Sequence, residues 1–305
     1  PVVFGALLVV PTYLIAARLG GRVTGVLASI VMALLPGLVL SRSLVGTADH
    51  NIAEPLFMGL AVAALMVAIA VGQREKPVWE QLRGFEFASM RSVLGYATLA
   101  GVATALYLYV WPPGILLVGV FGVYVILQMT SDVVSGESPE HVGIVAALSM
   151  SVTGVLLLAR LSTLSFGTTS FSLLQVLFPL AVAFGAAFLA WLARQWERRD
   201  VDPRAYPGAV LGILVVGVGV VAVAIPRLYS LVTSNLLRFV GFSAGAATRT
   251  IGEAQPFPLS MAQQYGLSQT EVLFHEYGFA FFLAFAMLAL LILEPLVRTR
   301  NTRKM

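Results

Sequence analysis

The sequence predicts an all-α fold, a polytopic transmembrane helical bundle of about nine spans. Of its 305 residues 58% are hydrophobic, and the mean hydropathy is +0.89. Only 11% are charged, whereas soluble domains carry roughly 25% charged residues. A soluble core could not bury this much apolar surface, but a lipid bilayer can accommodate it. Two further observations, the lengths of the apolar runs and the distribution of basic residues, give the number of spans and their orientation.

A transmembrane helix needs about 20 predominantly apolar residues. Runs of about this length fall at residues 1–17, 23–40, 53–72, 92–110, 114–130, 142–159, 172–193, 208–229 and 274–297. The first run is short, as expected for a truncated or tilted span. The chain has no cysteine, which excludes disulfides and thiolate metal sites.

Basic residues are distributed unevenly between the two sides of the predicted bundle. If the nine spans alternate in direction, 14 of the 19 Lys and Arg residues fall on one side. The other side then holds Arg42, Arg160, Arg227, Arg238 and Arg249. Because Lys and Arg concentrate in cytoplasmic loops, the basic side is predicted to be cytoplasmic. We therefore expect a multi-pass protein of the cell membrane.

The whole chain, residues 1–305, is interpreted as a transmembrane-domain fragment of a longer protein. It begins inside an apolar run with no charged region or cleavage site, so this run does not resemble a signal peptide. One predicted external loop, residues 230–273, is much longer than the others. Loops beyond roughly 12–15 residues are usually functional or disordered, so this loop is expected to be one or the other.

The first predicted external loop, residues 41–55, is rich in ionisable side chains. Such groups at a membrane edge are costly and are candidates for function. Asp49 and Asn51, two apart on an expected extended segment, offer oxygen ligands to a hard cation such as Mg²⁺ or Mn²⁺, and His50 could join or replace one of them. The loop is therefore a candidate metal site.

A structural interpretation accounts for part of the same loop. Asn51 and Glu54, three residues apart, form a capping-box pattern before the third span. Asp49 near a helix N-terminus is stabilised by the helix dipole. Neither effect explains Arg42 or His50, so both interpretations stay open.

Three other clusters lie on the predicted external side. Residues 111–114 (Trp-Pro-Pro-Gly) join two spans, and a tight turn with an interfacial aromatic residue explains them. Residues 250–253 (Thr-Ile-Gly-Glu) lie in the long loop, where a single carboxylate such as Glu253 is usually only solvated. His275 and Glu276 stand at the expected start of the ninth span, where helix capping and interface anchoring explain them.

Taken together, these tracts resemble the catalytic subunit of oligosaccharyltransferase, on its archaeal branch. The family's second external motif, Ser-Arg-Ser/Thr-x-x-Gly-x-x-Asp-x-(Asp, Glu or His), corresponds to residues 41–51. Its Trp-Pro-Gly-Gly turn is similar to residues 111–114, and its Thr-Ile-x-Glu tract matches residues 250–253. Order, spacing and predicted side of the membrane agree. Asn51 stands where members of the family usually carry an acid or His.

The resemblance implies a GT-C-like fold and transfer of an oligosaccharide from a dolichyl phosphate or pyrophosphate to Asn of Asn-x-Ser/Thr, on the external face. It implies a Mn²⁺ or Mg²⁺ cofactor held by Asp49, His50 and Asn51. The implied catalytic residues are Asp49, Glu253 and Arg42, with Glu253 accepting hydrogen bonds from the acceptor amide. The implied partners are a dolichyl-linked oligosaccharide, an acceptor protein or peptide, and membrane lipid, with no nucleic acid.

The remaining candidate residues divide between the two substrates. Candidates for contact with the donor phosphate are Arg249, His275 and Trp111. The acceptor loop is expected to comprise Thr250, Ile251, Gly252 and Glu253. The family also has an acidic loop after its first helix and a C-terminal soluble domain, and neither falls within residues 1–305. We therefore expect the fragment to be inactive alone.

Two alternative functions remain open at this point. One is a transporter in which Asp49, Glu54 and Glu276 form an ion path. The acids cluster at one face, however, whereas transporter sites lie near the bilayer midplane. The other is a different membrane glycosyltransferase that uses a polyprenyl-phosphate sugar, which would share the fold and the metal but would not require residues 250–253.

Overall fold

The computed structural model describes residues 1–46, 50–239, 262 and 266–302. Its regular structure is helical, and within this described part no strand forms beyond one isolated bridge between Thr163 and Ser172. The predicted all-α fold class is therefore confirmed. The chain divides into two compact units. Unit 1 comprises residues 1–52 and 237–305, and unit 2 comprises residues 53–236.

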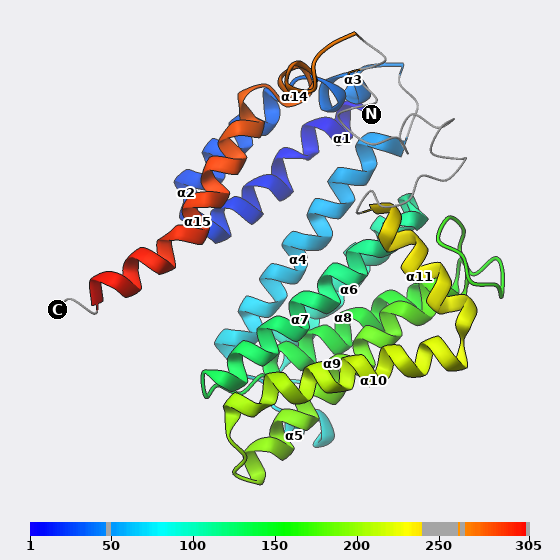
Figure 1. Ribbon diagram of the computed structural model, residues 1–305. Helices are drawn as coiled ribbons and strands as arrows, with labels where there is room; N and C mark the ends of the chain where they lie inside the picture. The colour runs from blue at the N-terminus through cyan, green and yellow to red at the C-terminus, as the bar shows by residue number, and fades with distance from the viewer. Residues whose placement is uncertain (47–49, 240–261, 263–265, 303–305) are drawn as a thin grey trace. The chain divides into compact units, whose positions relative to one another are not determined.

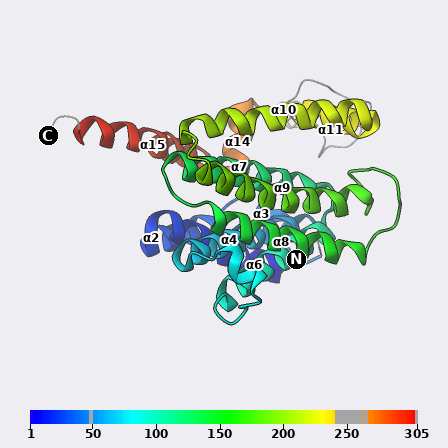
Figure 2. The ribbon, with the colours of Figure 1, turned by 90° about the horizontal axis from the view of Figure 1, so that it is seen from below.

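Unit 2 is a bundle of long helices (Figure 1). Its elements are α4 (Ala53–Glu75), α5 (Trp79–Arg83), α6 (Arg91–Val110), η2 (Pro112–Ile115), α7 (Leu116–Val134), α8 (Glu140–Leu158), α9 (Leu173–Arg198), η3 (Pro203–Ala205), α10 (Tyr206–Ala224) and the start of α11 (Pro226–Phe239). The view from below shows three layers, formed by α4, α6 and α8, then by α7 and α9, and then by α10 (Figure 2).

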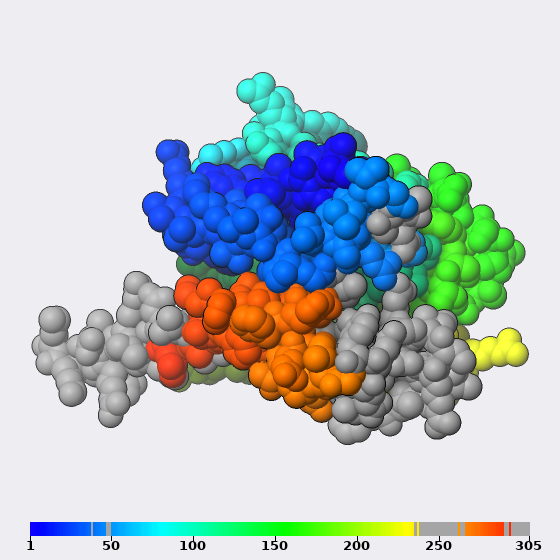
Figure 3. Space-filling view, turned by 90° about the horizontal axis from the view of Figure 1, so that it is seen from above, coloured from blue at the N-terminus to red at the C-terminus, as the bar shows by residue number. Residues whose placement is uncertain are grey.

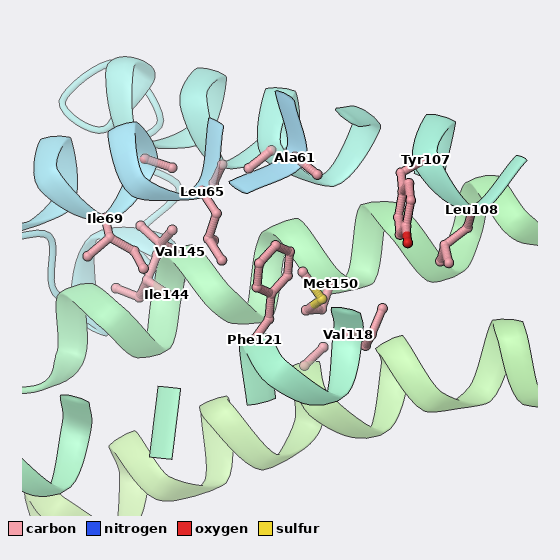
Figure 4. Close-up of a cluster of buried hydrophobic side chains, with 14 of the residues drawn as sticks. Ala61, Leu65, Ile69, Tyr107, Leu108, Val118, Phe121, Ile144, Val145 and Met150 are labelled. Atoms are coloured by element: carbon pink, nitrogen blue, oxygen red, sulfur yellow. The ribbon is translucent and has the colours of Figure 1, made fainter. Parts of the chain in front are cut away.

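The core of unit 2 lies among α4, α6, α7 and α8 (Figure 4). Leu65 of α4 and Ile144 of α8 are almost completely buried there. Phe121 of α7 and Met150 of α8 fill the space between the helices. By contrast, α10 exposes a run of Leu and Val side chains, as a helix that faces lipid does.

Close approach of backbones sets the spacing of α6 and α8. A methyl group at Gly101 of α6 would lie 2.4 Å from the Ser149 carbonyl oxygen of α8. The Thr153 hydroxyl of α8 donates a hydrogen bond of 3.0 Å to the Gly101 carbonyl oxygen. Small residues and hydroxyl groups are the usual means by which transmembrane helices associate.

Unit 1 contains one helical hairpin and one sharp bend between two helices. Its elements are α1 (Val2–Leu7), α2 (Val9–Ala33), α3 (Leu38–Ser43), η1 (His50–Ile52), α14 (Gln269–Tyr277) and α15 (Phe279–Thr302). Helix α2 reverses direction at Gly21, whose φ of 87° and ψ of 175° are not helical. The Ser29 hydroxyl of the second arm donates 3.4 Å to the Val9 carbonyl oxygen of the first.

Within the part of the chain that the structure describes, seven helices are long and apolar enough to cross a membrane, and the bent pair of α14 and α15 would make an eighth. The stretch 2–33 counts once in that number. Because this stretch folds back at Gly21, its two arms correspond to the first two predicted spans. The six predicted spans of unit 2 coincide with α4, α6, α7, α8, α9 and α10.

Some predicted span ends are wrong, because a turn interrupts the apolar run. The second span ends at Ala33 and not at residue 40, since the chain turns at Gly37 before α3. The eighth span ends at Ala224 and not at residue 229, because Ile225 precedes Pro226 and a residue before proline disfavours helical geometry. The ninth begins at Phe279 and not at residue 274. Gly278, with a φ of 56°, ends α14 and bends the chain by 94°. The expected loop 230–273 thus carries helix at both ends, while residues 240–261 lie outside the described residues.

We expect Gly101→Ala to lower the stability of the full-length protein, because the new methyl group forces α6 and α8 apart. Overpacking of this kind costs about 1–3 kcal/mol. The measurement is the melting temperature in detergent. Gly95→Ala is the matched control, since it lies on the same helix with nothing within 4 Å of the added methyl group. Equal losses in both variants would show that α6–α8 contact is not the cause.

Candidate functional site

The first part of the candidate site is a short helical segment that carries the Arg of the external motif. Helix α3 holds Ser41, Arg42 and Ser43 in its last turn. The Ser43 hydroxyl donates a hydrogen bond of 2.7 Å to the Leu40 carbonyl oxygen, so it closes the helix end. Element η1 lies beside α3, so the structure brings Arg42 into the neighbourhood of His50 and Asn51.

His50 and Asn51 form part of a 3-10 turn, followed by the buried Ile52. The expectation of an extended segment here is therefore wrong. The side chain of Ile52 is only 1% exposed, and its burial holds the turn in place at the start of α4. His50 is exposed and Asn51 half-buried.

A ring nitrogen and an amide oxygen are suitable ligands for a divalent cation, so His50 and Asn51 fit a metal site as two of its donors. Among the described residues, no group of three His, Asp or Glu side chains is placed to hold a metal ion. Asp49, the predicted carboxylate ligand, lies outside the described residues. The role of Asp49 as a ligand stays a prediction.

A turn at Pro36 and Gly37 leads into α3, and α14 packs against it (Figure 3). A methyl group at Gly37 would lie 2.6 Å from both the backbone oxygen and Oε2 of Glu276. Gly37 also has a φ of 70°, a conformation that side chains other than glycine rarely adopt. Its backbone conformation and the close contact therefore both require glycine at this position.

Glu276 is buried at 6% exposure, whereas the neighbouring His275 is exposed. His275 Nδ1 and Glu276 Oε1 lie 3.2 Å apart. Both stand in the last turns of α14, whose N-terminus is capped by Ser268 and Glu271. The interpretation of His275 and Glu276 as caps at the start of the ninth span is therefore wrong.

An open apolar hollow of about 770 Å³ adjoins His275 in unit 1. Its walls include Pro36, Phe274 and Phe282. Sequence reasoning did not anticipate the hollow or the burial of Glu276. The Pro36-Gly37 pair is a turn signal that could have indicated the packing position.

Trp111 belongs to unit 2, where it ends α6. Its backbone N–H donates 3.0 Å to the Tyr107 carbonyl oxygen, and its ring lies 6.5 Å from the Tyr107 ring. A methyl group at Gly114 would meet the Tyr107 ring at 2.5 Å. These contacts support the tight turn predicted for residues 111–114.

The other predicted site residues are not placed. Asp49, Arg249, Thr250, Ile251, Gly252 and Glu253 lie outside the described residues. Their roles stay predictions.

Comparison with known proteins bears on the whole chain. Residues 1–290 match the family described as oligosaccharyl transferase STT3, N-terminal. The chain is 51% identical over all 305 residues to the dolichyl-monophosphooligosaccharide–protein glycotransferase AglB of Haloferax volcanii, of which it covers 29%.

Two solved structures share the fold. An archaeal oligosaccharyltransferase from Archaeoglobus fulgidus, in complex with an inhibitory peptide and a dolichol-phosphate, matches with a TM-score of 0.75 and 22% identity over 93% of this chain and 32% of its own. A structure of the Archaeoglobus fulgidus oligosaccharyltransferase in complex with Zn and sulfate matches with a TM-score of 0.59 and 22% identity, covering 91% of this chain and 35% of its own.

The chain spans about a third or less of the length of these proteins. The family match covers more than nine-tenths of the chain, and the resemblance seen in its motifs is confirmed. The chain belongs to the STT3 family of oligosaccharyl transferases.

Proposed function

We propose that this chain is the membrane part of an enzyme that transfers an oligosaccharide from a dolichyl phosphate or pyrophosphate to Asn of Asn-x-Ser/Thr acceptors. The observation that carries the proposal is the adjacency of α3 and η1. It brings the family motif's Arg42, His50 and Asn51 together in a chain that is 51% identical to a named glycotransferase.

The acceptor amide is the chemical difficulty of this reaction. A carboxamide nitrogen is a poor nucleophile because its lone pair is delocalised into the carbonyl group. Carboxylates that accept hydrogen bonds from both N–H groups reduce this delocalisation. Glu253, on the acceptor loop with Thr250, Ile251 and Gly252, is proposed as one such carboxylate, and Asp49 as the second.

Asp49, His50 and Asn51 would hold Mn²⁺ or Mg²⁺, whose charge offsets the negative charge that develops on the leaving phosphate. The oxygen and nitrogen ligands present in η1 suit such a cation. A solved relative of the same fold is in complex with Zn and sulfate, which are a divalent cation and an oxyanion. This supports a metal-assisted reaction on a phosphate.

The donor phosphate is assigned to a second group of side chains. Arg42 can form a bidentate contact with phosphate or hold Asp49 in place. Further proposed contacts are Arg249, His275 and Trp111. His275 stands beside the apolar hollow of unit 1, which suits a hydrocarbon chain attached to a phosphate. The solved relative bound to dolichol-phosphate and peptide supports this class of partners.

The charge distribution of unit 2 supports an external site. Eight of its ten Lys and Arg residues lie at one end, namely Arg74, Lys76, Arg83, Arg91, Arg194, Arg198, Arg199 and Arg204. Arg160 and Arg227 lie at the other end. The basic end is proposed to be cytoplasmic. Because Ala53 starts α4 at the opposite end, the motif that directly precedes it belongs to the external side.

Variants of Asp49 and Glu253 in the full-length enzyme should separate metal binding from acceptor binding. Asp49→Ala removes an oxygen ligand, so it should weaken metal affinity, and excess Mn²⁺ should partly restore activity. Glu253→Gln replaces an acceptor oxygen with a donor, and it should lower the rate at every metal concentration. Losing a charge-assisted hydrogen bond costs about 1.5–3 kcal/mol, or on the order of 10- to 100-fold.

The measurement is a metal titration with a fluorescent acceptor peptide. Asn51→Asp serves as a gain-of-function arm, because a carboxylate should reduce the Mn²⁺ concentration needed for half-maximal activity. Rescue of Glu253→Gln by metal, without rescue of Asp49→Ala, would reverse the two roles. Wild-type behaviour of both variants would remove these residues from the mechanism.

Gly37→Ala should lower the transfer rate of the folded enzyme, because the methyl group collides with Glu276 and displaces α3 with its Arg42. Misplacement by about 1 Å costs up to the order of 100-fold in rate. Gly136→Ala is the matched control, since Gly136 also has a positive φ, lies in the turn between α7 and α8, and has nothing within 4 Å of the added methyl group. Initial rates per folded molecule are compared, and an equal loss in the control would contradict positioning by this contact.

A further inference from the structure

A cavity at the basic end of unit 2 has no part in the proposed transfer reaction. It lies between α5 and the C-terminal part of α9 and has a volume of about 260 Å³. A water molecule occupies about 30 Å³ in the liquid, so this space can hold a considerably larger group.

One face of α5 and one face of α9 line the cavity. Trp79 and Arg83 lie four residues apart on α5, so both occupy one side of that helix. Trp191, Arg194 and Arg198 follow the same spacing along one side of α9. Two aromatic rings and three guanidinium groups therefore line one small space.

Helix α5 is held in this position by polar contacts to α8 and α9. The Trp79 backbone N–H donates 3.2 Å to Glu140 Oε2 of α8. Arg194 of α9 forms an ion pair with Glu80 of α5, and its Nη1 lies 3.8 Å from Glu140 Oε1. The hydrogen bond from Arg194 holds the pKa of Glu80 below its usual range, so Glu80 stays ionised and the pair persists at neutral pH.

Two of the three arginines keep their charge available. Glu80 and Glu140 engage Arg194, whereas in the described part of the chain neither Arg83 nor Arg198 has a carboxylate within 4.0 Å. Both side chains are exposed. The cavity is therefore a positively charged space, and its natural ligand is an anion.

The surface of α9 next to the cavity identifies where the anion comes from. Phe184, Phe188 and Trp191 form a continuous series of ring contacts, with centroid separations of 6.4 and 5.6 Å. Phe184 is 73% exposed and Trp191 is 50% exposed, as expected for rings that contact lipid. Within one turn of Trp191 the helix becomes basic, which places the cavity at the level of lipid headgroups.

We propose that this cavity binds the phosphate headgroup of an anionic membrane lipid. Arg83 and Arg198 contact the phosphate oxygens, and the lipid tails run along Phe184 and Trp191. Basic pockets between transmembrane helices on the cytoplasmic side are typical binding places for anionic headgroups. Occupation of the site would fasten α5 to α9.

The test measures lipid binding by the full-length protein in a neutral detergent. Dioleoyl phosphatidylglycerol, dioleoyl phosphatidylcholine and inorganic phosphate are titrated separately, with melting temperature and native mass spectrometry as readouts. The cavity variant is Arg83→Ala with Arg198→Ala. The matched control is Arg74→Ala with Arg199→Ala, which removes the same charge from the same end of unit 2 without touching the cavity.

Phosphatidylglycerol should raise the melting temperature of the wild type and the control and remain bound in the mass spectrometer. In the cavity variant, its affinity should fall about five-fold for each arginine removed.

Three results would overturn the proposal. Equal responses to phosphatidylglycerol and phosphatidylcholine would show that the headgroup charge is not recognised. An equal response to inorganic phosphate would identify a free anion in place of a lipid. Equal losses in the control and the cavity variant would show diffuse attraction to a basic surface.

Discussion

The close approach of α6 and α8 at Gly101 is the contact on which the arrangement of unit 2 depends. Between helices in lipid, apolar side chains gain little from leaving the solvent, because hydrocarbon tails are equally apolar. Packing and interhelical hydrogen bonds must therefore hold the helices together. Gly101 and Thr153 supply both at one position. Gly143 of α8 allows a similar close approach to α9, because a methyl group at Gly143 would lie 2.7 Å from the Ala190 Cβ.

The polar ends of the bundle follow from this spacing. Because α8 is fixed between α6 and α9, its first residue, Glu140, reaches both the α5 backbone and Arg194. The two ends of unit 2 differ in charge and in the segments that they connect to. One end carries most of the positive charge, whereas the other is joined through Ile52 and Ala53 to the motif with His50 and Asn51. Packing in the middle of unit 2 thus determines the geometry of its basic end, where Glu140 meets α5 and Arg194.

The sequence was sufficient to predict where the helices run but not where they turn. Hydropathy reports contact with lipid, so the helices of unit 2 were predictable almost to their ends. Hydropathy does not indicate where a helix changes direction. The reversal at Gly21 and the bend at Gly278 depend on positive φ values at single glycines in apolar surroundings. Motif spacing likewise predicted Arg42, His50 and Asn51 as site residues, and their roles stay predictions. It could not reveal that Glu276 packs on Gly37, because this contact joins segments distant in sequence.

The hairpin of α2 has a consequence for where its turn and its end lie in a membrane. Arg18 and Arg22 flank the reversal at Gly21, and both arms are almost entirely apolar. Moving an arginine to the bilayer centre costs roughly 2.5–3.5 kcal/mol on insertion scales. If both arms enter lipid, the two arginines keep the turn at one membrane surface. Ala33, at the end of the second arm, then lies at the opposite surface.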